Sequence, residues 1–399
     1  MSKQLENEVW NLERCAGCGA CVAACSKRIL YFEGDVDHPS KKVVRKTVGL
    51  STTVLDVCHF CEMAGEVLCE LSCPRMKEDW PDGPVQKEVL VRTTGQNPSG
   101  VTNEIVSNLL AGAMRAGMID GALISDVDRW TLISHPRVAM SIADLVESAG
   151  NQFIWNPTLE GLAEAIYANN LHRIAVVGLP CMMEALERIS TSNTKALDYI
   201  SDRIILKVGL FCAGVYRQES LSEISSLLKI PQSSIKAISV SQRDDRLEVT
   251  TFSGETMEVN LSDVVKLVRK GCGRCYDLLA EAADISIGPL GAPEGHSVAI
   301  VRTNHGENAL DNAIAWDLLE VKDGVDDKAL EVLKANKKKR KKAEMIDGLQ
   351  ILMLEAFKDP SRIDEARKRF GEYYSMRTVD TTKEKEPADK SGCGTCSMC

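Results

Sequence analysis

Fifteen cysteines stand out in this chain of 399 residues, and they fall into four groups along the sequence. Cysteine thiolates bind soft metals and carry out redox chemistry, so their grouping is the first guide to function. The first group is Cys15, Cys18, Cys21 and Cys25, and the second is Cys58, Cys61, Cys69 and Cys73. The third is Cys181, Cys212, Cys272 and Cys275, and the fourth is Cys393, Cys396 and Cys399. An odd total cannot pair entirely as disulfides, which favours metal ligation or catalysis.

The spacing within the first two groups predicts iron–sulfur clusters. The run CAGCGACVAAC has the C-x2-C-x2-C-x3-C spacing of bacterial-type ferredoxins, whose fourth cysteine ligates a second cluster. The second run has a longer gap and ends in the expected Cys73-Pro74. Crosswise pairing predicts one 4Fe–4S cluster on Cys15, Cys18, Cys21 and Cys73, and another on Cys58, Cys61, Cys69 and Cys25. A pair of structural zinc sites is the alternative, because C-x2-C knuckles also suit tetrahedral zinc.

The third and fourth groups have less regular spacing. Cys181 and Cys212 each follow a short apolar run typical of a buried strand, and Cys272 and Cys275 form a C-x2-C knuckle. Because ligands gather at the carboxyl ends of parallel strands, these four cysteines predict a third 4Fe–4S cluster. The alternative is that Cys181 and Cys212 are small buried hydrophobic side chains. The three C-terminal cysteines are compatible with a metal role, with thiol redox chemistry and with an inert tail.

Composition limits the remaining classes of function. The chain has 57 acidic and 48 basic side chains, a formal net charge of −9, which argues against a general nucleic-acid binder. The first residues, MSKQLENEVW, contain no apolar segment typical of a secretion signal. No stretch approaches the roughly 18 apolar residues of a membrane span. We therefore expect a cytoplasmic protein with reduced thiols and no direct membrane span.

Apolar patterning predicts the elements that position the cysteines. Continuous apolar runs predict strands at residues 89–91, 121–125, 174–178 and 204–211, and residues 43–54 predict a small hairpin or loop insertion. Strands alternating with helices are typical of an α/β or α+β domain with a mostly parallel sheet.

A helix is expected from Ser99-Gly100 to about Ala116. Its first backbone N–H groups and the positive end of its dipole suit a pyrophosphate. The alternative is that Ser99 is an ordinary N-cap.

Four motifs resemble those of a known family. They are VVGLPCMMEAL at 176–186, VGLFC at 208–212, CGRCYDLLAEAADISIG at 272–288 and GAPEGHSVAIVRT at 291–303. Together they resemble the beta subunit of the coenzyme F420-reducing hydrogenase and formate dehydrogenase family, over about residues 88–310. With the ferredoxin run in front, the layout is similar to the F420H2-oxidising input subunits of archaea. Two positions depart from the usual motifs: residues 97–100 replace a Gln-Asp-Gly-Gly type loop, and His296 replaces a tryptophan.

The resemblance implies a flavin enzyme that transfers hydride between coenzyme F420 and FAD. Single electrons would then pass through three 4Fe–4S clusters to or from a partner subunit. That partner is expected to be a hydrogenase, a formate dehydrogenase, a heterodisulfide reductase or a membrane dehydrogenase. A ferredoxin-linked flavin reductase acting on another organic substrate is one alternative, and a flavin-free electron-transfer adaptor is another.

The FAD-contacting residues are expected at nine positions, and no residue is assigned as a general base. These positions are Ser99, Gly100, Val101, Thr102, Gly178, Pro180, Gly288, Gly291 and Arg302. Arg302, Lys207 and His296 are candidates for holding an anionic cofactor, and the alternative for each is an ion pair or a core contact.

Four parts are expected along the chain. Residues 1–84 form a two-cluster ferredoxin-like domain, and residues 85–310 an FAD-binding α/β domain with the inner cluster. Residues 311–377 form a helical region, and residues 378–399 a flexible Cys-rich tail. The basic run KANKKKRKK at 334–342 is interpreted as a solvated helix face or as a surface that steers an acidic partner.

Overall fold

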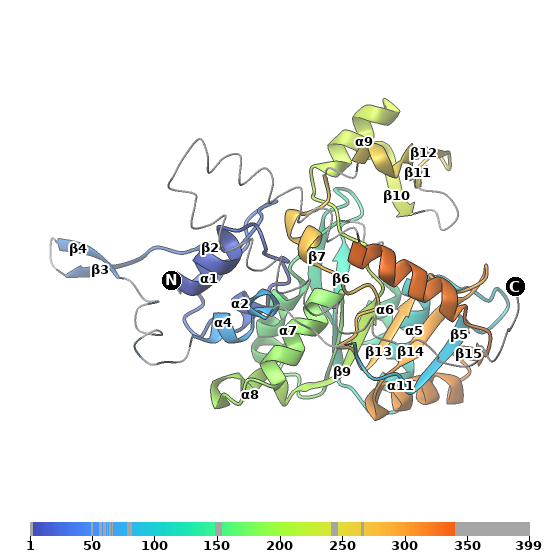
Figure 1. Ribbon diagram of the computed structural model, residues 1–399, viewed down its shortest axis with the longest axis horizontal. Coiled ribbons are helices and arrows are strands. Elements are labelled where there is room, and N and C mark those ends of the chain that lie inside the picture. The colour runs from blue at the N-terminus through green and yellow to red at the C-terminus, as the bar shows by residue number, and fades with distance from the viewer. Residues whose placement is uncertain are drawn as a thin grey trace, which may run out of the picture. The chain divides into compact units, whose positions relative to one another are not determined.

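The computed structural model describes the N-terminal five-sixths of the chain with short gaps. The described residues are 3–48, 51–55, 58, 61, 63, 65, 67–77, 82–147, 154–240, 246–264 and 267–339. Apart from residue 339 they lie in one compact unit, Met1–Lys338 (Figure 1). The helix expected near residue 360, the tail at 378–399 and its three cysteines lie outside the described residues.

An eight-stranded mixed sheet forms the centre of this unit. Its order is β15 (Leu319–Lys322), β5 (Lys87–Thr93), β14 (Ser297–Val301), β13 (Ile285–Gly288), β9 (Ile204–Leu210), β8 (Ile174–Gly178), β6 (Gly121–Val127) and β7 (Ser134–Ala139). The four predicted strands appear as β5, β6, β8 and β9. Only the pairs β13–β9, β9–β8 and β8–β6 are parallel. The expectation of a mostly parallel sheet was therefore wrong, because β6–β7 and β13–β14 are joined by short connections that allow only antiparallel pairing.

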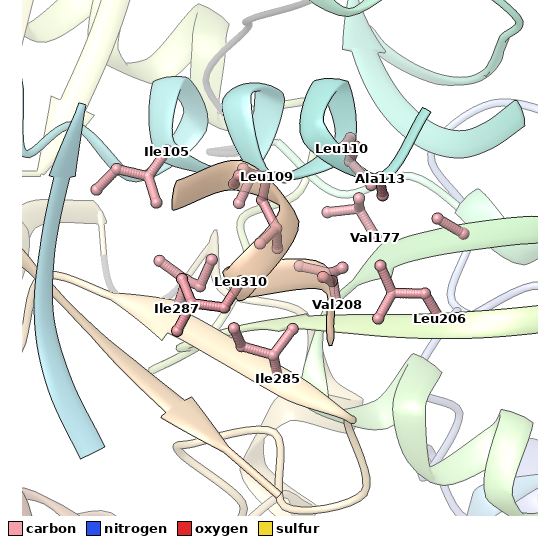
Figure 2. Close-up of a cluster of buried hydrophobic side chains, with 14 of the residues drawn as sticks. Ile105, Leu109, Leu110, Ala113, Val177, Leu206, Val208, Ile285, Ile287 and Leu310 are labelled. Carbon is pink, nitrogen blue, oxygen red and sulfur yellow. The ribbon is translucent and has the colours of Figure 1, made fainter. Parts of the chain in front are cut away.

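Helices cover both faces of the sheet, because successive strand residues point to opposite sides. In β8, Ala175 and Val177 face one core, and Ile174 and Val176 face the other. The first core packs against α5 (Thr102–Arg115), α6 (Ile142–Glu147) and α11 (Asn304–Ala315). Figure 2 shows side chains of α5 and α11 meeting those of β8, β9 and β13. The second core packs against α7 (Pro180–Ser190) and α8 (Lys195–Ser201).

The N-terminal module is built from short elements around the first two cysteine groups. Its helical elements are α1 (Lys3–Leu5), η1 (Glu6–Trp10), α2 (Ala20–Ala23), α4 (Leu68–Leu71) and η2 (Pro74–Met76). Its strands are β1 (Leu30–Tyr31), β2 (Ser40–Lys41), β3 (Val44–Val48) and β4 (Ser51–Leu55). The antiparallel pair β3–β4 is the hairpin that the sequence predicts at 43–54.

A smaller antiparallel sheet has an apolar cluster of its own, separate from the two cores of the main sheet. It consists of β10 (Ile235–Val240), β11 (Arg246–Thr251) and β12 (Thr256–Asn260), with α9 (Ser220–Leu228), η5 (Gln232–Ser234) and α10 (Leu261–Val264) nearby. Leu221 and Ile224 of α9 join Ile238 and Leu247 in this cluster.

The sequence predicts a helical region after residue 311, but the structure also has a strand there. The strand β15 follows α11 and pairs with β5, because Leu319 and Val321 alternate with charged residues and Leu319 is buried. Residues 327–339 are then helical. Within the described part of the chain, no helix has the length and apolar character needed to cross a bilayer.

The N-terminal module is joined to the sheet domain by close backbone contacts. Trp155 Nε1 donates to the carbonyl of Gly17 at 2.9 Å, and the N–H of Leu159 donates to the carbonyl of Cys18 at 3.1 Å. Gly19 has φ +88°, and a Cβ there would lie 2.5 Å from the carbonyl oxygen of Pro157. Glycine is required at this position for both its conformation and its size.

We predict that Gly19→Ala destabilises the protein by about 3 kcal/mol, since it combines left-handed strain with a backbone clash. Gly34→Ala is the matched control: Gly34 has φ +69° but open space around it, so strain alone should cost about 1 kcal/mol. Thermal unfolding of anaerobically purified variants measures both. Equal melting temperatures for the two variants would contradict the close contact.

Candidate iron–sulfur and flavin site

Three cysteines of the first run converge on a cysteine of the second. Cys21 lies in α2, Cys15 and Cys18 lie in the loop before it, and Cys73 directly precedes η2. Burial, followed by the nearby thiol of Cys73, raises the pKa of Cys15 to about 11 and also raises the pKa of Cys18. Burial and the thiols of Cys15, Cys18 and Cys73 raise the pKa of Cys21. These four thiols are the set expected for the first cluster.

Backbone N–H groups point at the same sulfurs. The N–H of Gly17 donates to Cys15 Sγ at 3.4 Å. Burial raises the pKa of Cys73, and hydrogen bonds from the N–H groups of Arg75 and Met76 oppose that rise. Such N–H donors stabilise thiolates and tune bound clusters.

The remaining four cysteines of the two runs share one small cavity. Cys25, Cys58, Cys61 and Cys69 all line a space of about 30 Å³ beside Leu68. Burial raises the pKa of Cys69 to about 12, and the thiols of Cys25 and Cys58 contribute to the rise. These are the four cysteines expected for the second cluster.

The third group gathers at the carboxyl ends of two parallel strands. Cys181 lies in the first turn of α7, after β8, and Cys212 follows β9. Cys272 and Cys275 come from η7 (Lys270–Arg274) and the residue after it. Burial raises the pKa of Cys181, with contributions from the thiols of Cys275 and Cys212. Burial also raises the pKa of Cys212 to about 12, and the nearby Lys337 opposes this rise.

The three groups follow one another in space. Among the thiols, Cys18 of the first group contributes most to the raised pKa of Cys181 in the third, and Cys69 of the second group contributes to the raised pKa of Cys21. The backbone of Gly271 lies directly against the carbonyl of Cys15, with no room for a Cβ. The first group therefore lies between the third and the second.

Buried cations accompany the thiols. Arg75 Nη1 lies 3.2 Å from Glu184 Oε2, and this carboxylate together with the thiols of Cys275 and Cys181 raises the pKa of Arg75 against the effect of burial. The Arg269 guanidinium lies 3.8 Å from the centroid of the Trp155 ring. Burial lowers the pKa of Arg269, and the thiols of Cys15 and Cys272 oppose this shift.

Each set offers four thiols, and sulfur ligands suit a soft metal. None of the twelve cysteines in the described part of the chain forms a disulfide. In the same described residues, no three His, Cys, Asp or Glu side chains are arranged to hold a single metal ion.

Eight of the nine expected FAD contacts lie along one edge of the main sheet, next to the third cysteine group. The strand register places Gly178 level with Gly209, and Gly288 lies against Phe211. The loop before α5 reaches the same edge, because Ser297 Oγ donates to the carbonyl of Gly100 at 2.8 Å. These eight are Ser99, Gly100, Val101, Thr102, Gly178, Pro180, Gly288 and Gly291.

The opening of α5 has no side-chain cap. Ser99 is not the N-cap; its Oγ accepts the N–H of Val101 at 3.1 Å, and Val101 occupies the N-cap position. A helix N-terminus without a side-chain cap fits a phosphate group.

Arg302 is not brought together with the other eight positions. It follows β14, which runs opposite to the parallel strands, so it lies at the other edge of the sheet. Its guanidinium is buried and donates to Ser286 Oγ at 2.6 Å and Glu281 Oε2 at 3.4 Å. Lys207 is paired with Glu187 at 2.9 Å. Both line a cavity of about 570 Å³ that none of the other eight positions lines. The ion-pair alternative describes both Arg302 and Lys207.

The sequence did not identify Arg75, Arg269 or Lys337 as neighbours of the cysteines. Lys337 Nζ donates to the carbonyl of Cys212 at 2.6 Å and to Cys275 Sγ at 3.7 Å. Lys337 was not singled out because it lies in a basic run, and such a run usually forms a solvated helix face.

Comparison with known proteins identifies the family. The family model "Coenzyme F420 hydrogenase/dehydrogenase, beta subunit N-term" matches residues 100–163, and the corresponding C-terminus model matches residues 171–327. An uncharacterized protein of Methanocaldococcus jannaschii is 32% identical over 371 residues, which cover 86% of this chain and 98% of that protein. This chain belongs to the coenzyme F420 hydrogenase/dehydrogenase beta subunit family.

Two further proteins similar to this chain have a named activity or belong to a named complex. The coenzyme F420-dependent sulfite reductase of M. jannaschii is 27% identical over 351 residues, covering 85% of this chain and 51% of that protein. A chain of the F420-reducing [NiFe] hydrogenase complex from Methanosarcina barkeri, solved as a xenon derivative, superimposes with a TM-score of 0.59 at 25% identity. The superposition covers 68% of this chain and 95% of that chain.

One carboxyl group near the first cysteine group has an unusual pKa. Glu160 lies in η3 (Thr158–Gly161), whose backbone contacts Gly19. Burial raises the pKa of Glu160 from 4.5 to about 7. Between these two pH values the unfolded chain loses the proton that the folded protein retains, so rising pH destabilises the folded state in this window.

We predict that Glu160→Gln stabilises the protein by about 1–2 kcal/mol above pH 7, less than the full shift implies because the carboxyl group is partly solvated. The difference in melting temperature from wild type should grow between pH 5.5 and 7 and then level off. Glu164→Gln, which alters an exposed carboxylate nearby, is the control. A pH-independent difference for Glu160→Gln would contradict the assignment.

Proposed function

We propose that this chain is an FAD and iron–sulfur oxidoreductase subunit that transfers hydride between coenzyme F420 and FAD and passes single electrons to or from a partner subunit. The observation that carries the proposal is the row of three four-thiol groups leading away from the sheet edge where the expected FAD contacts gather. Bound FAD would supply the conversion between two-electron and one-electron chemistry, which F420 and a cubane cannot exchange directly.

The chain's own residues have distinct tasks in this proposal. The uncapped first turn of α5 would bind the FAD phosphates through backbone N–H groups, and Ser297 holds the preceding loop in place. Cys181, Cys212, Cys272 and Cys275 would hold the cluster nearest the flavin. The second group, farthest along the row, would face the partner.

The proposal also draws on the relatives. Coenzyme F420 appears in the descriptions of both matched family models and of proteins with different overall activities. Because the partner differs among those proteins, we propose F420 as the shared reactant and leave the partner as a redox subunit or domain. A hydrogenase, formate dehydrogenase, heterodisulfide reductase or membrane dehydrogenase would each suit this role.

The central test is anaerobic mixing of purified protein with reduced F420. We expect about twelve irons and twelve sulfides per chain for three 4Fe–4S clusters, together with one FAD. The flavin absorbance should bleach on mixing with F420H2. Iron and flavin without bleaching would reject F420 as the hydride carrier, and absence of flavin would reject a flavin enzyme.

Two cysteine variants test the second and third cysteine groups, which lie at the two ends of the row, separately. Cys69→Ala and Cys181→Ala should each lower the iron content by about one third, because each removes a ligand of one cluster. Flavin bleaching by F420H2 should survive in Cys69→Ala, whereas electron delivery to an artificial acceptor should fall at least tenfold. Equal iron content in both variants and wild type would contradict the grouping of the thiols.

A further inference from the structure

The helical segment 327–339 carries a lysine into the third cysteine group. The segment is the unlabelled orange-red helix in Figure 1. Leu330 is buried in the apolar cluster with Leu90 and Val298, and it fills the space beside Gly291. Lys337 lies two turns further on, and therefore on the same face of the helix. This packing fixes the register that directs Lys337 inward.

Lys337 is buried, with 6% of its surface exposed. Its ammonium group donates to the carbonyls of Cys212 and Asp277 and to Cys275 Sγ, the last at 3.7 Å. The Asp277 carboxylate is engaged elsewhere: it accepts the N–H groups of Leu279 and Glu281, each at 3.0 Å. Among the ion pairs of the described residues, none involves Lys337.

Neighbouring lysines of the same basic run behave differently. Lys334 lies 2.8 Å from Glu281 and 3.2 Å from Asp82, and Lys338 lies 3.6 Å from Asp82. Arg75, the other cation close to Cys275, is paired with Glu184. Carboxylates thus form ion pairs with these three cations, whereas the Lys337 ammonium contacts a thiol of the third group and two backbone carbonyls.

We propose that Lys337 is a positioning residue that holds a positive charge against the third cluster and raises its reduction potential. The inference rests on the proposed function in one respect, since it needs a 4Fe–4S cluster on Cys181, Cys212, Cys272 and Cys275. A reduced cluster carries one more negative charge than an oxidised one, so a fixed cation beside a ligand thiolate favours reduction. The family model for the C-terminal part ends at residue 327, so this cation comes from beyond the matched region.

The experiment compares Lys337→Met, Lys337→Gln and Lys337→Arg with the control Lys338→Met, which removes a lysine whose side chain is 43% exposed. Iron and sulfide contents are measured first. Redox titration followed by electron paramagnetic resonance then gives the midpoint potential of the signal that is lost in Cys181→Ala.

We expect Lys337→Met and Lys337→Gln to shift the reduction equilibrium of this cluster at least tenfold toward the oxidised form, a drop of about 59 mV for one electron. Lys337→Arg and Lys338→Met should remain near wild type. If Lys337→Met loses the cluster, Lys337→Gln decides the point, because it keeps an N–H donor and removes only the charge.

A wild-type potential in Lys337→Gln or Lys337→Met, with the cluster retained, would overturn the proposal. Loss of the cluster in Lys337→Arg would also overturn it, because lysine shape rather than charge would then be required. Failure of the proposed function itself is recognised separately, since wild-type protein would then lack the signal that Cys181→Ala removes.

Discussion

A thiolate loses its hydration when it moves into a protein interior, and only nearby hydrogen-bond donors and positive charges can replace that stabilisation. Burial is the largest influence on the pKa of the thiols of Cys15, Cys18, Cys21, Cys181 and Cys212. Backbone N–H groups in tight turns, together with Arg75, Arg269 and Lys337, provide the opposing stabilisation. The same requirement explains the Gly-rich first run, because only small residues allow these turns to approach the sulfurs.

This requirement also explains how the parts of the chain depend on one another. Arg75 belongs to the N-terminal module, yet the thiols of Cys181 and Cys275 in the sheet domain contribute to its raised pKa. Arg269 belongs to the sheet domain, yet its side chain donates to the carbonyls of Val36 and Asp37 in the module, each at 2.9 Å. Each part thus contributes a cation to the thiols of the other. The proposed electron path and the structural contact between the parts rest on the same side chains.

The grouping of the cysteines could be proposed from the sequence because ligand spacing is a local property, and their assignment to three clusters stays a prediction. The strands β5, β6, β8 and β9 were predictable for a similar reason, since each is a continuous apolar run. The mixed sheet and β15 were not, because strand direction depends on contacts between distant segments. Arg302 was expected among the FAD contacts because it lies in a family-like motif, but the direction of β14 places it at the opposite edge of the sheet from the other eight positions. Lys337 was not recognised as a neighbour of the cysteines. Its inward direction depends on the burial of Leu330, which sets the register of the helix, and charge composition does not reveal that packing.

The contact between Gly271 and Cys15 bears on the proposed passage of electrons through the chain. A free ferredoxin must diffuse to its partner and dock, so its transfer rate depends on ionic strength and concentration. Here the backbone of Gly271 lies against the Cys15 carbonyl, and Trp155 is hydrogen-bonded to Gly17. In the proposed function, the N-terminal module would therefore be a fixed part of the electron path and not a tethered shuttle. Transfer between the first and third groups would be insensitive to salt, viscosity and dilution, and those variables would act only on encounters with an outside protein.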